Sequence, residues 1–184
     1  MKKIKYNLEV EILTPLHISN GVEEGGYIDS YIVKEVKGKE KIPYIPASSI
    51  KGKVRDNFYT ILNTYYGKDK AENITNSIFG SEGYNPSKIY FEDLRCEDNV
   101  KTSIRFGNAI DRYTKHTKDR ALKCIEVLEN GKFLGTVTVF LQDDLVEYKD
   151  YLEMAFKMIE SLGGNKSRGL GRVKISLEKR EADV

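Results

Sequence analysis

Ten residues near the end of the chain combine the backbone and side-chain groups that hold phosphate. The segment 163–172 reads Gly-Gly-Asn-Lys-Ser-Arg-Gly-Leu-Gly-Arg. Its four glycines let the backbone approach a ligand closely, with free amides to meet phosphate oxygens. Cations and a hydroxyl stand among them, at Lys166, Ser167, Arg168 and Arg172. The segment predicts phosphate contact, and a helix end followed by a glycine-rich turn is the alternative.

The expected start of a helix near residue 48 is a second candidate phosphate site. Helix N-termini attract anions through their free amides and the helix dipole. Two hydroxyls and three cations occupy the first turns here, at Ser48, Ser49, Lys51, Lys53 and Arg55. The segment therefore predicts phosphate binding, and an ordinary amphipathic helix capped by a serine is the alternative.

Two further side chains offer acid–base chemistry. Asp29 ends a glycine-flanked loop, where its carboxylate can act as a base or help to hold a divalent ion. A turn residue is the commoner role for an aspartate in this position. His17 follows the first expected strand, where a histidine contacts RNA, transfers protons or serves a purely structural role.

Charge is distributed unevenly along the chain, although the net charge is only +2. Basic residues outnumber acids by five to two over 111–123 and by six to one over 165–180, whereas acids outnumber lysines by six to two over 143–160. The segment 108–118, with Arg112 and Tyr113, is either a protruding hairpin that touches nucleic acid or a solvated loop. Basic segments that contain aromatics and glycines indicate a phosphate-rich partner, and segregated solvated faces are the alternative.

Length and composition exclude several classes of protein. The 184 residues suit one domain, and 40% hydrophobic with 32% charged residues is typical of a globular chain. We expect neither a membrane span nor a signal peptide, since the chain has no long apolar run. Two cysteines outside any CxxC motif favour a reducing, cytoplasmic setting, and two histidines argue against a His-rich metal site.

Hydrophobic periodicity predicts an α+β fold. Alternation over 4–12 indicates a half-buried strand, and helical spacing follows from Ser48 or Ser49 to Gly67. A strand over 88–94, a hairpin turning at Asn130-Gly131, a helix from Asp143 or Asp144 to Gly163 and a strand over 172–177 complete the core. Strand, helix, strand, strand, helix, strand is the ferredoxin-like order. We expect insertions at about 15–47 and 95–130.

In this order, these segments resemble the RAMP superfamily of CRISPR proteins. The resembling text covers nearly the whole chain: Pro-Leu-His-Ile at 15–18, Gly-Tyr-Ile-Asp-Ser at 26–30, Ile-Pro-Ala-Ser-Ser-Ile-Lys-Gly-Lys-Val-Arg at 45–55, Ile-Asp-Arg-Tyr-Thr at 110–114, and the glycine-rich segment 163–172. The Ile-Asp-Ser and Ile-Asp-Arg-Tyr-Thr elements are similar to those of the repeating backbone subunit of type III effector complexes.

The resemblance implies a single RAMP domain with a ferredoxin-like palm and a thumb formed by the insertion at 95–130. It implies copies that stack along a guide crRNA beside other effector subunits, with thumbs that interrupt the guide–target duplex at six-nucleotide steps. Target RNA is cut beside each step, and Asp29 matches the essential aspartate, with a divalent cation such as Mg²⁺ as cofactor. His17, the helix-start residues, Arg112, Tyr113 and the glycine-rich segment then bind RNA.

Three other functions remain open from the sequence. The chain can be a binding-only subunit of the same architecture, in which Asp29 is a turn residue. It can be a guide-processing ribonuclease with His17 as general base. It can also be an unrelated RNA-recognition module, although its strands lack obvious paired aromatic stacking motifs.

Overall fold

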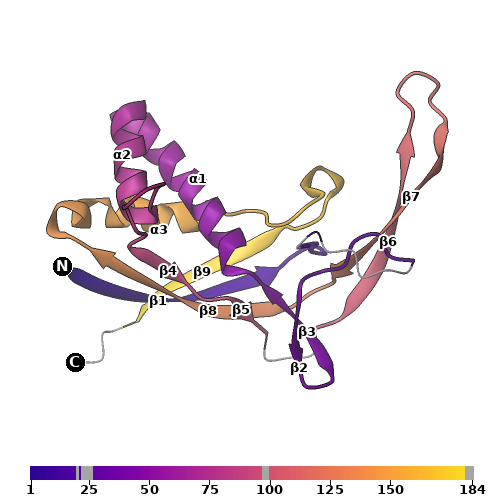
Figure 1. Cartoon of the computed structure of the whole chain (residues 1–184), viewed down its shortest axis with the longest axis horizontal. Helices are drawn as coiled ribbons and strands as arrows, with labels where there is room; N and C mark the ends of the chain where they lie inside the picture. Colours follow the sequence, from indigo (N-terminus) through magenta and orange to yellow (C-terminus); the bar gives the residue numbers. More distant parts are fainter. Residues whose placement is uncertain (20, 22–26, 97–99, 181–184) are drawn as a thin grey trace.

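The computed structural model describes residues 1–19, 21, 27–96 and 100–180. Figure 1 shows one large sheet with the helices on one of its faces and a long hairpin projecting from one end. The elements in chain order are β1 (Lys2–Ile12), β2 (Lys34–Lys37), β3 (Glu40–Ile45), α1 (Ala47–Tyr66), α2 (Lys68–Phe79), β4 (Ile89–Phe91), β5 (Leu94–Arg95), β6 (Thr102–Ile110), β7 (Thr117–Leu128), β8 (Lys132–Leu141), the 3₁₀ turn η1 (Asp143–Tyr148), α3 (Lys149–Lys157), the 3₁₀ turn η2 (Lys166–Arg168) and β9 (Val173–Arg180).

The centre of the large sheet has the strand order of a ferredoxin-like fold. Strands β9, β1, β8 and β4 lie side by side, and every pairing between them is antiparallel. Strands β5, β3 and β2 extend the sheet beyond β8. The α+β, ferredoxin-like prediction is therefore confirmed, with α1 and α3 as the two helices of the core motif.

The alternation in β1 separates the two faces of the sheet. Ile4, Tyr6, Leu8 and Val10 are buried, whereas Lys3, Lys5 and Asn7 are exposed. The buried set packs with Ile50, Val54 and Phe58 of α1 and with Leu152 and Phe156 of α3 in one core. The palm is thus a two-layer unit in which helices cover one face of the sheet only (Figure 1).

The sequence prediction was wrong about the turn at Asn130-Gly131. Strands β7 and β8 do follow each other there, but they do not pair: β7 pairs with β6, and β8 pairs with β1. The reason is that Leu128 is hydrogen bonded to Leu16, while the Gly131 carbonyl accepts from the Ile12 amide at 3.0 Å. The chain therefore leaves the hairpin and enters the palm sheet at this point.

The predicted cap of the first helix and the predicted type and end of the second also need correction. The first helix begins at Ala47 with Pro46 as its N-cap, and neither Ser48 nor Ser49 caps it. The second begins as the 3₁₀ turn η1, becomes α-helical only at Lys149 and ends at Lys157. The Asp93 carboxylate accepts from the Ala47 amide at 2.8 Å, so an acid from a distant loop satisfies this helix end.

The β6–β7 hairpin lies within the segment predicted as an insertion and projects away from the palm (Figure 1). Its tip, between Ile110 and Thr117, includes Arg112 and Tyr113, which are both exposed. The Asp111 carboxylate accepts from the amides of Thr114 and Tyr113, and these two bonds hold its pKa below the ordinary value. We call this hairpin the thumb. The extents 15–47 and 95–130 stay predictions, and residues 20, 22–26 and 97–99 within them lie outside the described chain.

In the described part of the chain, no helix is both long enough and apolar enough to span a membrane.

Candidate nucleic-acid interface

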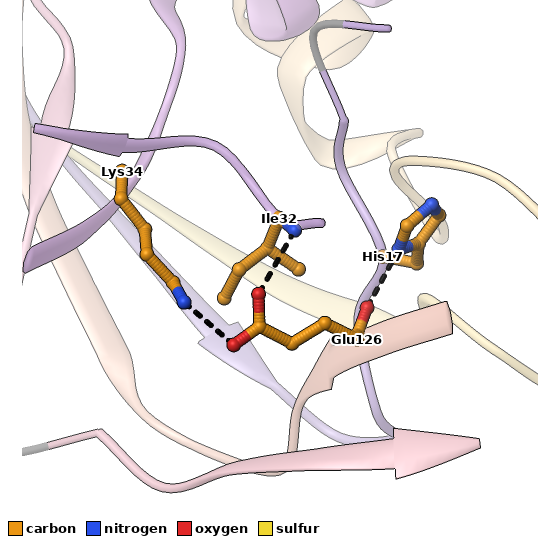
Figure 2. Close-up of polar contacts among 4 residues, drawn as sticks. All are labelled: His17, Ile32, Lys34 and Glu126. Carbon is orange, nitrogen blue, oxygen red and sulfur yellow. Dashed lines mark hydrogen bonds and ion pairs between the residues drawn. The ribbon is translucent and has the colours of Figure 1, made fainter. Parts of the chain in front are cut away.

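Glu126, on β7 at the base of the thumb, joins three segments of the chain. Its carboxylate accepts from the Lys34 ammonium at 2.6 Å and from the Ile32 amide at 3.2 Å. Its own amide donates to the Ser30 carbonyl at 2.9 Å. Its carbonyl accepts from His17 at 2.7 Å (Figure 2). The Glu126 side chain is 9% exposed, so these bonds replace water around a buried carboxylate.

His17 is buried in this cluster, and both ring nitrogens have protein partners. Its Nδ1 lies 2.7 Å from the Glu126 carbonyl, which only accepts, so Nδ1 carries the proton. In the neutral ring Nε2 then accepts from the Ser30 hydroxyl at 3.2 Å. This arrangement favours the structural role for His17, because the ring is fixed between the thumb base and the residue that follows Asp29.

Asp29 is attached to the thumb through one residue of β7. Its amide donates to the Cys124 carbonyl at 2.9 Å, and its Oδ2 accepts from the Cys124 amide at 2.6 Å. The residue is nonetheless exposed. A carboxylate has acceptor capacity for about four hydrogen bonds, so the contact with Cys124 orients Asp29 and leaves capacity for a ligand.

Two of the glycines near the C-terminus serve packing. At Gly163, with φ +72°, a Cβ would lie 2.2 Å from the His17 carbonyl oxygen, and at Gly171, with φ +78°, 2.1 Å from the Leu162 carbonyl oxygen. The Gly164 amide donates to that His17 carbonyl at 2.9 Å, and the Gly171 amide to Pro15 at 2.8 Å. Close backbone contact with His17 and with Leu162 therefore requires two of the glycines that the sequence assigned to ligand approach.

The cationic part of the glycine-rich segment is exposed beside the thumb. Lys166, Ser167 and Arg168 form η2 and all are exposed. The Arg168 guanidinium reaches β6, where Nη1 lies 3.6 Å from the position of a Cβ at Gly107. The Arg172 amide donates to the Thr14 hydroxyl, which fixes the backbone at this residue. The Arg172 side chain is exposed. The structure thus brings His17, Asp29, the glycine-rich segment and the thumb base together.

The helix-start residues form a second cluster on α1. Lys51 donates to the Ser87 hydroxyl at 2.9 Å and Arg55 to the Asn76 side-chain oxygen at 2.8 Å. Partial burial lowers the pKa of the Lys51 ammonium, and the Arg55 guanidinium lowers it further. The partner in each of these two bonds is neutral, so neither bond offsets the positive charge that could attract an anion. Ser48 is exposed, and Ser49 and Lys53 are partly exposed.

No cluster of three or more His, Cys, Asp and Glu side chains suited to a metal ion occurs among the described residues. Asp29 is the predicted metal ligand, and it contributes a single carboxylate. Mg²⁺ is commonly bound through one or two carboxylates together with substrate phosphates and water. The residues present therefore suit an ion that RNA helps to hold.

Sequence reasoning missed Glu126, Lys34 and Ser30. Alternation gave no signal for Glu126, because apolar residues stand at both odd and even positions over 122–128 and Val127 is as buried as Leu128. Its partners Ile32 and Lys34 lie 94 and 92 residues away in the sequence, and no local spacing reveals them.

The palm, the thumb and the glycine-rich segment together are typical of one class of protein. Comparison of the sequence with models of known families identifies that class. The model of the RAMP superfamily matches residues 9–174. The chain therefore belongs to the RAMP superfamily.

Three relatives are similar to nearly the whole chain. Each is named CRISPR system Cms endoribonuclease Csm3. The protein of Streptococcus thermophilus is 30% identical over 93% of this chain and 86% of its own length. Those of Mycobacterium tuberculosis and Enterococcus italicus are 27% and 26% identical, covering 99% and 96% of this chain and 90% and 91% of their own.

We expect strong coupling between Lys34 and Glu126. Lys34→Met or Glu126→Gln leaves a partly buried charge without its partner, so each is expected to lower the free energy of unfolding by roughly 1.5–3 kcal/mol. The double variant should lose less than the sum, as measured by urea unfolding. The exposed Glu9–Lys132 pair, at 3.4 Å, is the control and should couple by less than about 1 kcal/mol. Additive losses at Lys34 and Glu126 would contradict this account of the cluster.

A pair of glycine variants separates backbone strain from close contact. Gly163 and Gly169 both have positive φ, +72° and +80°, but nothing lies within 4 Å of a Cβ at Gly169. We expect Gly169→Ala to lower the free energy of unfolding by about 1–2 kcal/mol from strain alone. Gly163→Ala should cost clearly more, because its Cβ meets backbone, and thermal unfolding of both variants measures the difference. Equal losses would show that contact with His17 is not limiting.

Proposed function

We propose that this chain is the backbone subunit of a type III CRISPR effector complex, which binds the phosphates of a guide crRNA and cuts complementary target RNA. The observation that carries this proposal is the placement of Asp29, an exposed carboxylate held by Cys124 at the base of the thumb. Arg168 of η2 reaches β6 of the same hairpin. Relatives over almost the full length named as endoribonucleases support the same activity.

RNA supplies its own nucleophile for this reaction. When the backbone is distorted, the 2′-hydroxyl oxygen can align with the scissile phosphorus, and geometry alone then removes much of the barrier. Asp29 accepts the 2′-proton as a general base. The 2′-oxygen bonds to phosphorus as the bond from phosphorus to the 5′-oxygen breaks, and the leaving 5′-oxygen takes a proton from water. The products are a 2′,3′-cyclic phosphate and a 5′-hydroxyl. Thumb residues Arg112 and Tyr113 meet the RNA where the duplex is interrupted.

A divalent cation, with Mg²⁺ as the natural candidate, belongs to this proposal as a cofactor. It would supply positive charge that offsets the charge developing on the phosphate. Asp29 would hold it together with RNA oxygens and water.

Guide binding falls to the two cationic clusters. Lys51, Lys53 and Arg55 on α1, and Lys166, Arg168 and Arg172 near the glycine-rich segment, contact phosphates without reading bases. Ser48, Ser49 and Ser167 add hydroxyl contacts. Further copies of the chain, other type III effector subunits and the target RNA are the partners in this proposal.

Two alternatives differ in chemistry. In a binding-only subunit, the bond from the Cys124 amide to Asp29 would be the whole role of that carboxylate. A guide-processing ribonuclease with His17 as base is less favoured, because both ring nitrogens are engaged by Glu126 and Ser30.

Asp29→Asn separates the catalytic role from the structural one. The amide oxygen still accepts from the Cys124 amide, so folding and assembly should persist, whereas the base is lost. We expect cleavage of target RNA by the reconstituted guide complex to fall by about 100-fold or more. Asp69→Asn, on the exposed start of α2, is the charge-matched control and should cut normally. A cleavage ladder that survives both Asp29→Asn and Asp29→Ala would contradict the catalytic role of Asp29.

Arg168→Ala tests phosphate contact. Loss of one contact should weaken guide binding equally for unrelated RNA sequences, and the slope of log K against log salt should become shallower by roughly 0.7. Lys51→Ala should do the same from α1. Lys68→Ala, at the exposed start of α2, is the control for the loss of one positive charge. Salt titrations of crRNA binding give these slopes, and an unchanged slope for Arg168→Ala would argue against contact.

A further inference from the structure

The face of the palm sheet that the helices leave uncovered presents a continuous row of side chains across four strands. Tyr90 of β4 lies opposite Thr138 of β8, Thr138 opposite Lys5 of β1, and Lys5 opposite Arg180 of β9. Their sequence neighbours Ile89, Val139 and Ile4 are buried beneath the helices, so alternation directs this row away from the core.

An aromatic pair stands at one end of this row. Tyr90 and Phe140 are 50 positions apart in the sequence, yet their ring centroids lie 5.8 Å apart at an interplanar angle of 86°. Tyr90 is 56% exposed although its ring lies edge-to-face against Phe140. Folding therefore creates the paired aromatic motif that the separate strands did not reveal, and it holds one ring in contact with solvent.

Positive charge surrounds the pair. The Lys3 ammonium lies 5.7 Å from the centroid of the Phe140 ring. Lys5 and Arg180 face each other directly across β1 and β9, and like charges in that position destabilise a sheet. No acid pairs with Lys3, Lys5 or Arg180 in the described part of the chain. The repulsion between Lys5 and Arg180 is explained if an anion binds between these two side chains.

This outer patch, composed of Lys3, Lys5, Tyr90, Phe140 and Arg180, is separate from the thumb base. Lys3 lies nine residues before Ile12, the end of β1 that leads to His17, so a strand rise of about 3.3 Å puts the two regions roughly 30 Å apart. In the next row Asn7 faces Glu178, and beyond it Glu9 pairs with Lys132, so acids bound the patch on that side.

We propose that the outer patch is a second binding surface for single-stranded RNA, in which a base stacks on Tyr90 and the flanking phosphates meet Lys3, Lys5 and Arg180. An exposed ring among cations that have no acidic partner among the described residues suits a ligand that offers both π-faces and closely spaced phosphates. An acidic protein surface would satisfy the cations and leave Tyr90 without a role. This surface does not depend on the proposed cleavage activity.

Tyrosine variants of the full-length chain test the stacking. We expect Tyr90→Ala to weaken binding of a short fluorescent oligouridine by roughly tenfold in anisotropy titrations, because a base loses its stacking partner. Tyr90→Phe keeps the ring and should bind like the parent. Ultraviolet cross-linking followed by mass spectrometry should find uridine on the peptide that contains Tyr90. Arg168→Ala, measured in parallel, should lower affinity without removing that cross-link, so failure at the guide site is distinguishable from failure here.

Lys5→Glu tests the charge and keeps the outcome clear if a tyrosine variant folds poorly. A glutamate opposite Arg180 converts a repulsive pair into an attractive one, so this variant should unfold at a higher temperature than the parent and yet bind oligouridine several-fold more weakly. Lys5→Gln should lie between the two in affinity.

Three results would overturn the proposal. These are parental affinity in both Tyr90→Ala and Lys5→Glu, absence of the cross-link at Tyr90, or equal losses in Tyr90→Ala and Tyr90→Phe. If instead Tyr90→Ala impairs assembly with effector subunits while oligouridine binding is unchanged, the outer patch is a protein contact.

Discussion

The buried carboxylate of Glu126 is the contact on which the geometry of the interface depends. A charged group at this depth is tolerable only when donors replace its lost hydration, and the Ile32 amide and the Lys34 ammonium do so. The backbone groups of the same residue fix Ser30 and His17. Ser30 is thereby attached to the base of the thumb, and the two bonds between Asp29 and Cys124 orient the preceding residue relative to the same strand. Figure 2 shows how Glu126 contacts Lys34, Ile32 and His17.

Local patterns predicted the elements well and their long-range pairing poorly. Alternation over 4–12 and helical spacing up to Gly67 correspond to β1 and α1, since each reflects burial of one face. The turn at Asn130-Gly131 misled because its sequence suits a hairpin, whereas contacts with Leu16 and Ile12 decide where the strands pair. The sequence did not reveal Asp93 as the acid at the start of α1 either, because Asp93 lies 46 residues after Ala47.

The candidate site shows the same division. Residue types marked Asp29, Lys51 and Arg168 as sites of chemistry, and the structure leaves the carboxylate of Asp29 and the guanidinium of Arg168 exposed. The four glycines near the C-terminus were weaker evidence for a ligand site than their number suggested. Gly163 and Gly171 are needed because two backbone segments touch at these positions. The pairing of Tyr90 with Phe140 depends on strand register, and a sequence without its sheet does not contain it.

Only Glu129, Asn130 and Gly131 separate the long thumb strand β7 from β8, which lies between β1 and β4 in the palm sheet. The Glu129 amide is bonded to Lys101 and the Gly131 carbonyl to Ile12, so this junction is pinned on both sides. At this junction, a sideways force on the tip passes through hydrogen-bonded backbone as a bending moment into β8. Along this connection the thumb and the palm form one lever, so a displacement of the tip would bend the strand that lies between β1 and β4.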